Sequence, residues 1–213
     1  MALRKQSFSI NEYYHLYNRG TEKRIIFLDK KDYEHFLFLM YLCNTEKSII
    51  LREIDKFFNR EETIVDVGAY CLMPNHFHIL VREKKENGIS TYMRKLLTGY
   101  SMYFNKKYKR TGKLYEGVFK SIHIDKDNYL KYIYSYIHLN PAKLINKNWR
   151  ESKNNNRTNL LNYVLKYPYS SIKEYTEQKF QILNPSQFPI YFKKLIDHKK
   201  ELFEWLNFSD TNT

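Results

Sequence analysis

Two short apolar runs separated by a proline-containing turn constrain the fold of this chain more than any other feature. The runs are Thr63–Cys71 and a strand from His76 to about Val81, with Met73-Pro74-Asn75 between them. Apolar, β-branched runs bounded by turn residues are typical of strands. Side chains of a strand alternate between its faces, so His76 and His78 point one way and Phe77 the other. The pattern predicts that Phe77 anchors the strand in the core.

The two histidines leave two interpretations open. Imidazoles side by side on one strand face can bind a divalent metal and leave coordination positions for a substrate. A strand with two solvated histidines has the same spacing, and a motif this short does not separate the two cases. The rest of the chain has to decide between them.

Hydrophobic spacing outlines the remaining elements. Further strands are predicted at 12–20 and 118–124. Helices are predicted at 29–42, with Asp29 as its cap, and at 90–107, with Ser90 as its cap. The residues at 44–62 have the spacing of a second helix or a helical insertion. The stretch at 147–160 is polar, and helical spacing returns at 160–165, 172–178 and 185–208.

The charge of the chain predicts a polyanionic partner. Lys and Arg number 36 against 23 Asp and Glu, a formal net charge of +13. Such an excess suits nucleic acid or an anionic membrane surface. No apolar run approaches transmembrane length, which disfavours a membrane anchor. The 20 tyrosines suit single-stranded nucleic acid, whose bases stack on aromatic rings, although many can equally be half-buried packing residues.

Two further features concern the compartment. The chain has only two cysteines, Cys43 and Cys71, so a disulfide framework is not implied. The first seven residues carry charges without a following apolar segment of the signal-peptide type. Together they lead us to expect a reducing, cytoplasmic environment.

A basic stretch with interleaved aromatic residues runs from 106 to 121. It is the strongest candidate for contacts with a nucleic-acid backbone, although a solvated charged loop has the same composition. The candidate DNA-binding residues, together with Arg19, are Lys106, Lys107, Lys109, Arg110, Lys113 and Lys120.

The helix expected at 126–139 presents two different faces. At roughly 100° per residue, its apolar residues cluster on one side, which should face the core. Tyr132 and Tyr136 lie at the polar edge, and only Tyr136 has Asn140 one turn further on. Tyr136 can therefore present its hydroxyl to a cleft, or be a core-edge tyrosine. Asn140 can lie beside it, or stop the helix before Pro141. His138 points away from this stripe.

Four segments, taken together, resemble the single-tyrosine transposase family of bacterial insertion sequences, and within it the REP-associated tyrosine transposases. They are Tyr14-His15-Leu16-Tyr17-Asn18-Arg19-Gly20, Met73-Pro74-Asn75-His76-Phe77-His78, the stretch 112–121 and Tyr136-Ile137-His138-Leu139-Asn140-Pro141. The likeness covers about residues 10–175 in the same order. Val118 stands where relatives often carry arginine.

The resemblance implies an α+β fold with a central antiparallel, ferredoxin-like sheet and helices packed on it. It covers the segments 44–62 and 147–160 and the tail poorly, so their description comes from hydrophobic spacing and charge. Together they predict a catalytic domain at 1–146, with a helical insertion at 44–62, and a basic, mostly helical C-terminal extension at 147–213. The resemblance also implies a metal-dependent endonuclease and strand transferase of the HUH type, acting on single-stranded DNA with hairpin structure through a 5′-phosphotyrosine. Tyr136 is then the nucleophile, and His76, His78 and Asn140 are the ligands of Mg²⁺ or Mn²⁺.

Two other functions stay open: a non-catalytic hairpin-binding protein on the same fold, and an RNA-binding or RNA-processing module. REP-associated relatives are expected to act as monomers, whereas the wider group exchanges the tyrosine helix between two subunits. The short connection from Ile124 into the tyrosine helix favours a monomer, with a dimer as the alternative.

Overall fold

A four-stranded antiparallel sheet forms the centre of the computed structural model, which describes residues 7–54, 58–151, 156–191 and 195–207. Its order is β2-β3-β1-β4. The strands are β1 (Tyr13–Arg19), β2 (Val65–Met73), β3 (His76–Glu83) and β4 (Lys120–Ile124). The two apolar runs on either side of the proline-containing turn form the antiparallel pair β2–β3, and β1 pairs with both β3 and β4. The expected α+β class with an antiparallel sheet is confirmed.

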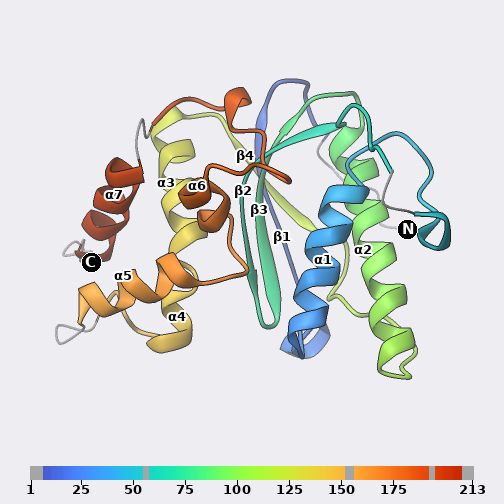
Figure 1. The fold of residues 1–213 in the computed structure, drawn as a ribbon, viewed down its shortest axis with the longest axis horizontal. Helices are drawn as coiled ribbons and strands as arrows, with labels where there is room; N and C mark the ends of the chain where they lie inside the picture. The colour runs from blue at the N-terminus through green and yellow to red at the C-terminus, as the bar shows by residue number, and fades with distance from the viewer. Residues whose placement is uncertain (1–6, 55–57, 152–155, 192–194, 208–213) are drawn as a thin grey trace.

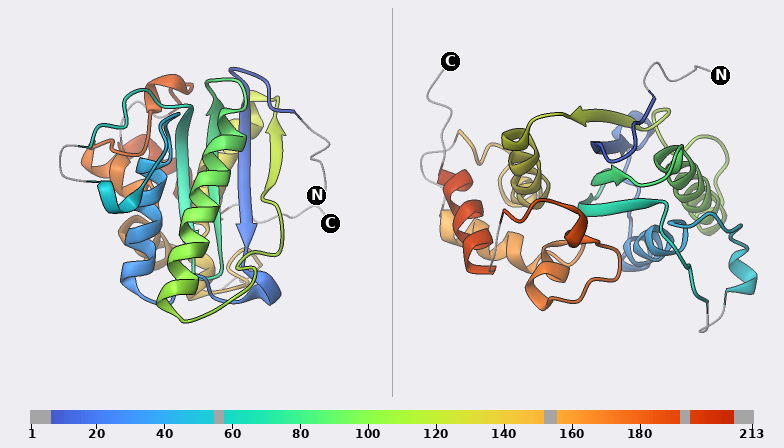
Figure 2. Two further views of the ribbon diagram at one scale, coloured as in Figure 1. Left: turned by 90° about the vertical axis from the view of Figure 1, so that its right-hand side faces the viewer. Right: turned by 90° about the horizontal axis from the view of Figure 1, so that it is seen from above.

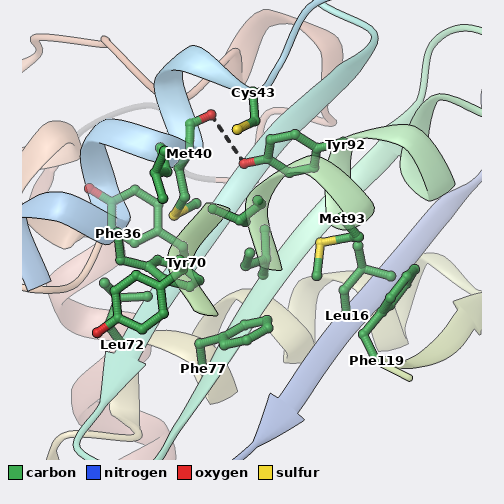
Figure 3. Packing of buried hydrophobic residues seen from close by; sticks show 14 of the residues in the cluster. Leu16, Phe36, Met40, Cys43, Tyr70, Leu72, Phe77, Tyr92, Met93 and Phe119 are labelled. Carbon is green, nitrogen blue, oxygen red and sulfur yellow. Dashed lines mark hydrogen bonds between the residues drawn. The ribbon is translucent and has the colours of Figure 1, made fainter. Parts of the chain in front are cut away.

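One face of the sheet is covered by two helices, α1 (Lys30–Leu42) and α2 (Gly88–Lys107) (Figures 1 and 2). The chain order β1-α1-β2-β3-α2-β4 is the ferredoxin-like arrangement. Asp29 caps α1 in a capping box with Asp32, as its type and place before the helix predict. Phe77 and Leu16 are fully buried under these helices, next to residues of α2 such as Met93 (Figure 3). The predicted core position of Phe77 is confirmed.

The other face of the sheet carries α3 (Asp127–Leu139), which packs on β2, β3 and β4. The four helices that follow α3 in the chain lie on the same side of the sheet (Figure 1). These are α4 (Ala142–Ile145), α5 (Arg157–Lys166), α6 (Ile172–Glu177) and α7 (Leu195–Asn207). Short 3-10 turns occur at Thr21–Lys23, Leu51–Glu53 and Pro185–Gln187.

The last helix, α7, packs against α3 and α5. Leu202 and Leu206 are fully buried there in a hydrophobic cluster with Leu139 of α3. An ion pair of 3.0 Å between Lys131 and Glu201 joins α3 and α7 as well. The C-terminal part of the chain therefore supports the helix that carries Tyr136.

The structure corrects several of the predicted elements. Helix α2 begins at Gly88 with Asn87 at its N-cap position, and Ser90 lies inside the helix. Within 44–62, where residues 55–57 lie outside the described part, the structure has turns and the 3-10 turn Leu51–Glu53, and no α-helix. The described apolar residues there are half-buried or exposed, with Ile50 45% exposed, so their helical spacing does not mark the buried face of a helix. The fourth strand, predicted from residue 118, begins at Lys120. Val118 lies in the preceding loop and is 64% exposed.

The tail prediction, 185–208, is corrected in the same way. A 3-10 turn occupies Pro185–Gln187, and α7 begins only at Leu195; residues 192–194 and 208 lie outside the described part. The polar stretch 147–160 also ends earlier than predicted, since α5 starts at Arg157 with Asn156 as its cap. Among the described helices, none is both long and apolar enough to cross a membrane.

Candidate active site

The two histidines of β3 lie on the face of the sheet that α3 covers. His76 is half-buried and His78 is buried, and their ring centroids are 5.1 Å apart. Phe77 between them points to the opposite face, under α1 and α2. The alternation predicted from the sequence is thus confirmed, and the two imidazoles are near neighbours.

The Nδ1 atom of each imidazole has a hydrogen-bonding partner. The Nδ1 of His76 lies 2.6 Å from Oδ1 of Asn75, and the Nδ1 of His78 lies 2.9 Å from Nε2 of His15. Burial lowers the pKa of His76 to about 4, with smaller contributions from the cations Arg19 and Lys143. Burial also lowers the pKa of His78 well below its usual value. Both rings are therefore neutral at pH 7, the form that binds metals.

Tyr136 of α3 faces these histidines. Its ring centroid lies 5.4 Å from that of His78 and 5.8 Å from that of His15. The side chain is half-buried, and burial raises the pKa of its phenol. Helix α3 places it there because its apolar stripe, including Ile133 and Ile137, packs on the sheet and leaves Tyr136 at the edge.

A cavity of about 350 Å³ connects these groups. We call it the cation-lined cavity, because three basic side chains line it with one carboxylate, Glu116. Strands β1, β3 and β4, the loop before β4, and helices α3 and α4 all contribute to it. Its lining residues are Tyr17, Asn18, Arg19, His76, His78, Glu116, Lys120, Tyr136 and Lys143.

A second cavity of about 290 Å³ adjoins the first and shares Tyr17, His78 and Tyr136 with it. Its remaining lining consists of aromatic and aliphatic side chains and His15. These residues are His15, Ile122, Tyr129, Tyr132 and Ile133. The site therefore has a charged part and an aromatic part on either side of Tyr136.

Asn140, predicted as the third metal ligand, lies one turn beyond Tyr136 at the end of α3. It is buried, and its side-chain nitrogen donates to the carbonyl oxygen of Tyr136 at 2.8 Å. Its Oδ1 accepts from Nζ of Lys143 at 3.2 Å. Asn140 thus serves as the C-cap of the helix and orients Lys143, and its role as a ligand stays a prediction.

The structure places the predicted DNA-binding residues in three kinds of environment: in the cation-lined cavity, exposed on the surface, or paired with other side chains of the protein. Arg19 and Lys120 line the cation-lined cavity, and Lys106, Lys109 and Lys113 are exposed. The other two have protein partners. Lys107 pairs with Asp29 and with buried Asp32 at 2.8 and 2.7 Å. Arg110 donates to Asn105 at 3.2 Å.

The loop before β4 is held beside the site by backbone contacts. Gly20 forms an isolated antiparallel bridge with Tyr115, and the amide of Glu116 donates to the carbonyl of Arg19 at 3.0 Å. These contacts bring Glu116 and Lys120 to the cavity although they lie about 100 residues from β1. The basic stretch and the first strand therefore meet at one end of the sheet.

Several residues that line the two cavities had no role assigned from the sequence, among them His15, Glu116 and Lys143. His15 and Tyr17 alternate on β1 as His76 and His78 do on β3, which is a readable signal for a shared face. Lys143 is seven residues after Tyr136, two helical turns, but the intervening Pro141 made its direction unpredictable. Glu116 is placed only by the loop contacts described above.

The donor set is compatible with a divalent metal. With Nδ1 of each histidine engaged, Nε2 of His76 and of His78 is the nitrogen left to bind an ion, an arrangement that fixed metal-binding histidines commonly show. In the described residues no cluster of three or more His, Cys, Asp or Glu side chains could hold an ion. Within the described part of the chain, an amide or a phosphate oxygen is the kind of donor that could complete the set.

Comparison with known proteins bears on the fold and the family of this chain. A solved structure, titled "Structure of the REP associates tyrosine transposase bound to a REP hairpin", is similar over 92% of this chain and 93% of its own, with 12% identity and a TM-score of 0.52. At this identity the likeness concerns the fold. No curated protein matches. The family model for "Transposase IS200 like" matches residues 11–140, more than half of the 213 residues. The chain therefore belongs to the IS200-like transposase family.

Proposed function

We propose that this transposase cuts and rejoins single-stranded DNA next to a hairpin through a covalent bond between Tyr136 and a 5′-phosphate. The observation that carries the proposal is the meeting of Tyr136 with His76 and His78 in one cation-lined cavity. A nucleophile, two metal-binding imidazoles and phosphate-binding cations are the parts that phosphodiester cleavage needs.

The side chains of the cavity divide the work. Arg19, Lys120 and Lys143 surround the place of the scissile phosphate and attract its charge. His76 and His78 would hold Mg²⁺ or Mn²⁺ through Nε2, and a bound ion would polarise a non-bridging phosphate oxygen and offset charge that develops in the transition state. Asn140 is the proposed third ligand, and its Oδ1 would then be shared with, or released by, Lys143.

The reaction forms one bond and breaks one. The phenolic oxygen of Tyr136 attacks phosphorus in line with the 3′-oxygen of the preceding nucleotide. The new O–P bond gives the 5′-phosphotyrosine, and the broken bond leaves a 3′-hydroxyl. Tyr136 loses one proton and the 3′-oxygen gains one. The phosphotyrosine is again a phosphodiester, so the bond energy is kept for rejoining and no external energy source is needed. Attack by a 3′-hydroxyl on the phosphotyrosine reverses the step or joins a new strand.

The proposed partner is DNA with a hairpin and an unpaired flank. The net charge of +13 supports a polyanion, and the similar fold is seen with a REP hairpin in its own structure. The exposed Lys106, Lys109 and Lys113 are proposed to contact the backbone, with Arg19 and Lys120 nearer the cut. Affinity would then come chiefly from phosphate neutralisation.

The test is a search for the covalent adduct. The protein is incubated with labelled single-stranded DNA from the flanks of its own gene and Mn²⁺, and resolved under denaturing conditions. We expect a labelled protein band, absent with a chelator. Tyr136→Phe should remove the band and leave hairpin affinity within about twofold, since only one hydroxyl is lost. Tyr132→Phe, four residues away on α3, is the matched control and should keep the band.

Peptide mapping identifies the nucleophile. A phosphonucleotide on any tyrosine other than Tyr136 contradicts the assignment. His76→Ala should abolish the adduct while hairpin binding in chelator survives, because backbone cations carry most of the affinity. Hairpin binding without any adduct would favour a non-catalytic DNA-binding protein. Stronger binding of a matched RNA hairpin would favour an RNA-binding function.

A further inference from the structure

We propose that the second cavity, lined by Tyr17, Ile122, Tyr129, Tyr132 and Tyr136, is a binding slot for one unpaired nucleobase of single-stranded DNA. We call it the tyrosine slot. The inference rests on the proposed function, because it places the base of a nucleotide whose phosphate lies in the cation-lined cavity. It adds a base-binding subsite to a site so far described by its metal-binding and phosphate-binding groups.

The slot has two aromatic walls from different elements. Tyr129, Tyr132 and Tyr136 follow one another at three and four residues along α3, so they form one stripe of that helix. The rings of Tyr129 and Tyr132 are nearly parallel, at 19° with centroids 6.0 Å apart. Tyr17 of β1 and Ile122 of β4 provide the opposite wall from the sheet. A flat ring between these walls would contact aromatic or aliphatic surface on both faces.

The slot is suited to a nucleobase by chemistry and by size. Neither a carboxylate nor a lysine or arginine lines it, and its polar groups are phenol oxygens and the imidazoles of His15 and His78. Its volume of about 290 Å³ lies just below the range, about 300–1,000 Å³, that is usual for small-molecule pockets. Such a space is large enough for one flat base. Each base has a π face, so stacking of this kind tolerates different sequences.

Continuity with the cation-lined cavity identifies the occupant as part of a nucleotide. The two cavities share Tyr17, His78 and Tyr136, so a group in one lies next to a group in the other. Nζ of Lys120 lies 5.9 Å from the ring centroid of Tyr17, at the boundary of the two. An apolar ring site beside a cationic site matches the base and the phosphate of one nucleotide.

The slot is preformed rather than collapsed. The ring of Tyr132 is held from behind by Trp205 of α7, with ring centroids 5.1 Å apart in an edge-to-face arrangement. The guanidinium of Arg150 lies 3.5 Å from the hydroxyl of Tyr132. Ile122 is 38% exposed and Tyr129 is half-buried, so the slot opens to solvent. Walls fixed before binding reduce the conformational entropy that the protein side chains lose when a base binds.

Photo-crosslinking can locate a base in the slot. The probes are hairpins whose single-stranded flanks carry 5-iododeoxyuridine at one position each, bound to the full chain in EDTA so that no cleavage occurs. On irradiation this base crosslinks to aromatic rings that stack on it. For at least one flank position we expect peptide mapping to find the crosslink on Tyr17, Tyr129 or Tyr132. Crosslinks confined to tyrosines elsewhere would overturn the proposal.

An affinity measurement tests the stacking energy. The quantity measured is the affinity for a hairpin with a normal flank divided by the affinity for the same hairpin with an abasic flank. The abasic flank keeps every phosphate and lacks the bases. We expect the wild type to bind the normal flank about 5–150-fold more tightly, because stacking contributes about 1–3 kcal/mol per base. Tyr129→Ala should reduce this ratio at least threefold, and Tyr129→Phe should retain it.

Tyr163→Ala is the control for this series. Tyr163 is a half-buried tyrosine of α5 that lines neither cavity, so its loss should leave the ratio unchanged. A ratio near one in the wild type, or a ratio that Tyr129→Ala does not change, overturns the tyrosine slot. If the hairpin binds and the adduct forms while this ratio fails, the slot alone is wrong. If no hairpin binds, the proposed function falls and the slot with it.

Discussion

At the scale of single residues, His15 has an unusual position for a polar side chain. It is 4% exposed, and its Nε2 lies 2.9 Å from Nδ1 of His78. Its own Nδ1 has no hydrogen-bond partner in the described part of the chain. Burial lowers the pKa of His15 to about 4, so the ring is neutral. If Nδ1 of His78 donates to His15, then Nε2 of His78 carries a lone pair and can bind a metal.

We therefore predict that His15→Ala weakens metal-dependent cleavage about 10–100-fold, the usual effect of losing a group that orients a metal-binding histidine. Hairpin binding in EDTA should stay within about twofold of the wild type. The measurement is the rate of adduct formation as a function of Mn²⁺ concentration. A loss of metal affinity shifts this curve to higher concentration.

The control is His123→Ala. His123 of β4 pairs with Glu12 at 2.8 Å and lines neither cavity. This variant should cleave at the wild-type rate. If His15→Ala also shows an unchanged Mn²⁺ dependence, His15 does not set the tautomer of His78.

At the scale of elements, the contact between α3 and α7 contains a buried histidine pair. Nδ1 of His138 lies 3.2 Å from Nε2 of His198, and Nε2 of His138 lies 2.7 Å from Oγ of Ser171. Ser171 in turn contacts the backbone of Tyr70 on β2. One proton between the two facing ring nitrogens satisfies both rings in their neutral form. A second proton there would place two N–H groups against each other.

This pair should make the stability of the protein depend on pH. Burial lowers the pKa of His198 from 6.5 to about 4, with Glu201 opposing, and lowers the pKa of His138 well below its usual value. Both histidines bind more protons when unfolded than when folded. Their contribution to stability is therefore complete above pH 6.5 and is lost as the pH falls towards 4.

We predict a fall in the free energy of unfolding, on the order of 3 kcal/mol from His198, because one unit of pKa corresponds to about 1.4 kcal/mol. Urea unfolding at pH 7, 6, 5 and 4.5 measures it. His198→Gln keeps a polar group near His138 but cannot titrate, so its pH dependence should be shallower. An equal slope in both proteins would show that other groups, such as His15 and His76, account for the whole effect.

At the scale of the whole molecule, the positive charge is divided between structural and free cations. Lys107 is 25% exposed and pairs with Asp29 and with Asp32, whose side chain is fully buried. Tyr103 and Tyr108 also donate to Asp32, at 3.1 and 2.8 Å. This cluster joins the start of α1 to the end of α2. Lys113, by contrast, is exposed in the loop beside the site.

The two lysines should therefore behave differently. Lys113→Ala should reduce the slope of log affinity against log salt by about 0.7–0.9, the value for one phosphate contact, with little change in stability. Lys107→Ala should leave the slope nearly unchanged and lower the free energy of unfolding by roughly 1–3 kcal/mol, because Asp32 loses its cation. Hairpin binding at several salt concentrations and urea unfolding measure the two effects. Equal slopes for Lys113→Ala and the wild type contradict this division.

The path of the chain also bears on the oligomeric state. Two residues connect Ile124 of β4 to Asp127 of α3, and α3 packs on β2 and β3 of its own sheet. Tyr136 thus reaches His78 of the same chain. We predict a monomer that cleaves with its own tyrosine, and light scattering at low micromolar concentration should give the monomer mass.

Mixing two inactive variants separates the alternatives further. Tyr136→Phe and His76→Ala together restore cleavage only if a tyrosine helix can be exchanged between subunits. We expect no activity from the mixture. A stable dimer that regains activity on mixing would show that the helix is exchanged.

The sequence by itself determined the parts of this protein that depend on local pattern. Period-two alternation placed His76 and His78 opposite Phe77, and helical periodicity placed Tyr136 at the edge of the apolar stripe of α3. Both follow from backbone geometry that every strand or helix shares. The motif resemblance identified the family that the comparison confirms over residues 11–140.

Only the tertiary structure decided which distant segments meet. Helical spacing at 44–62 predicted a helix that is not found in the described residues there, since spacing does not report what a loop packs against. His15, Glu116 and Lys143 enter the site through strand pairing, a loop contact and a turn after Pro141. Asn140 and Lys107 found partners within the protein. These outcomes depend on contacts between residues far apart in the chain, which composition and periodicity do not contain.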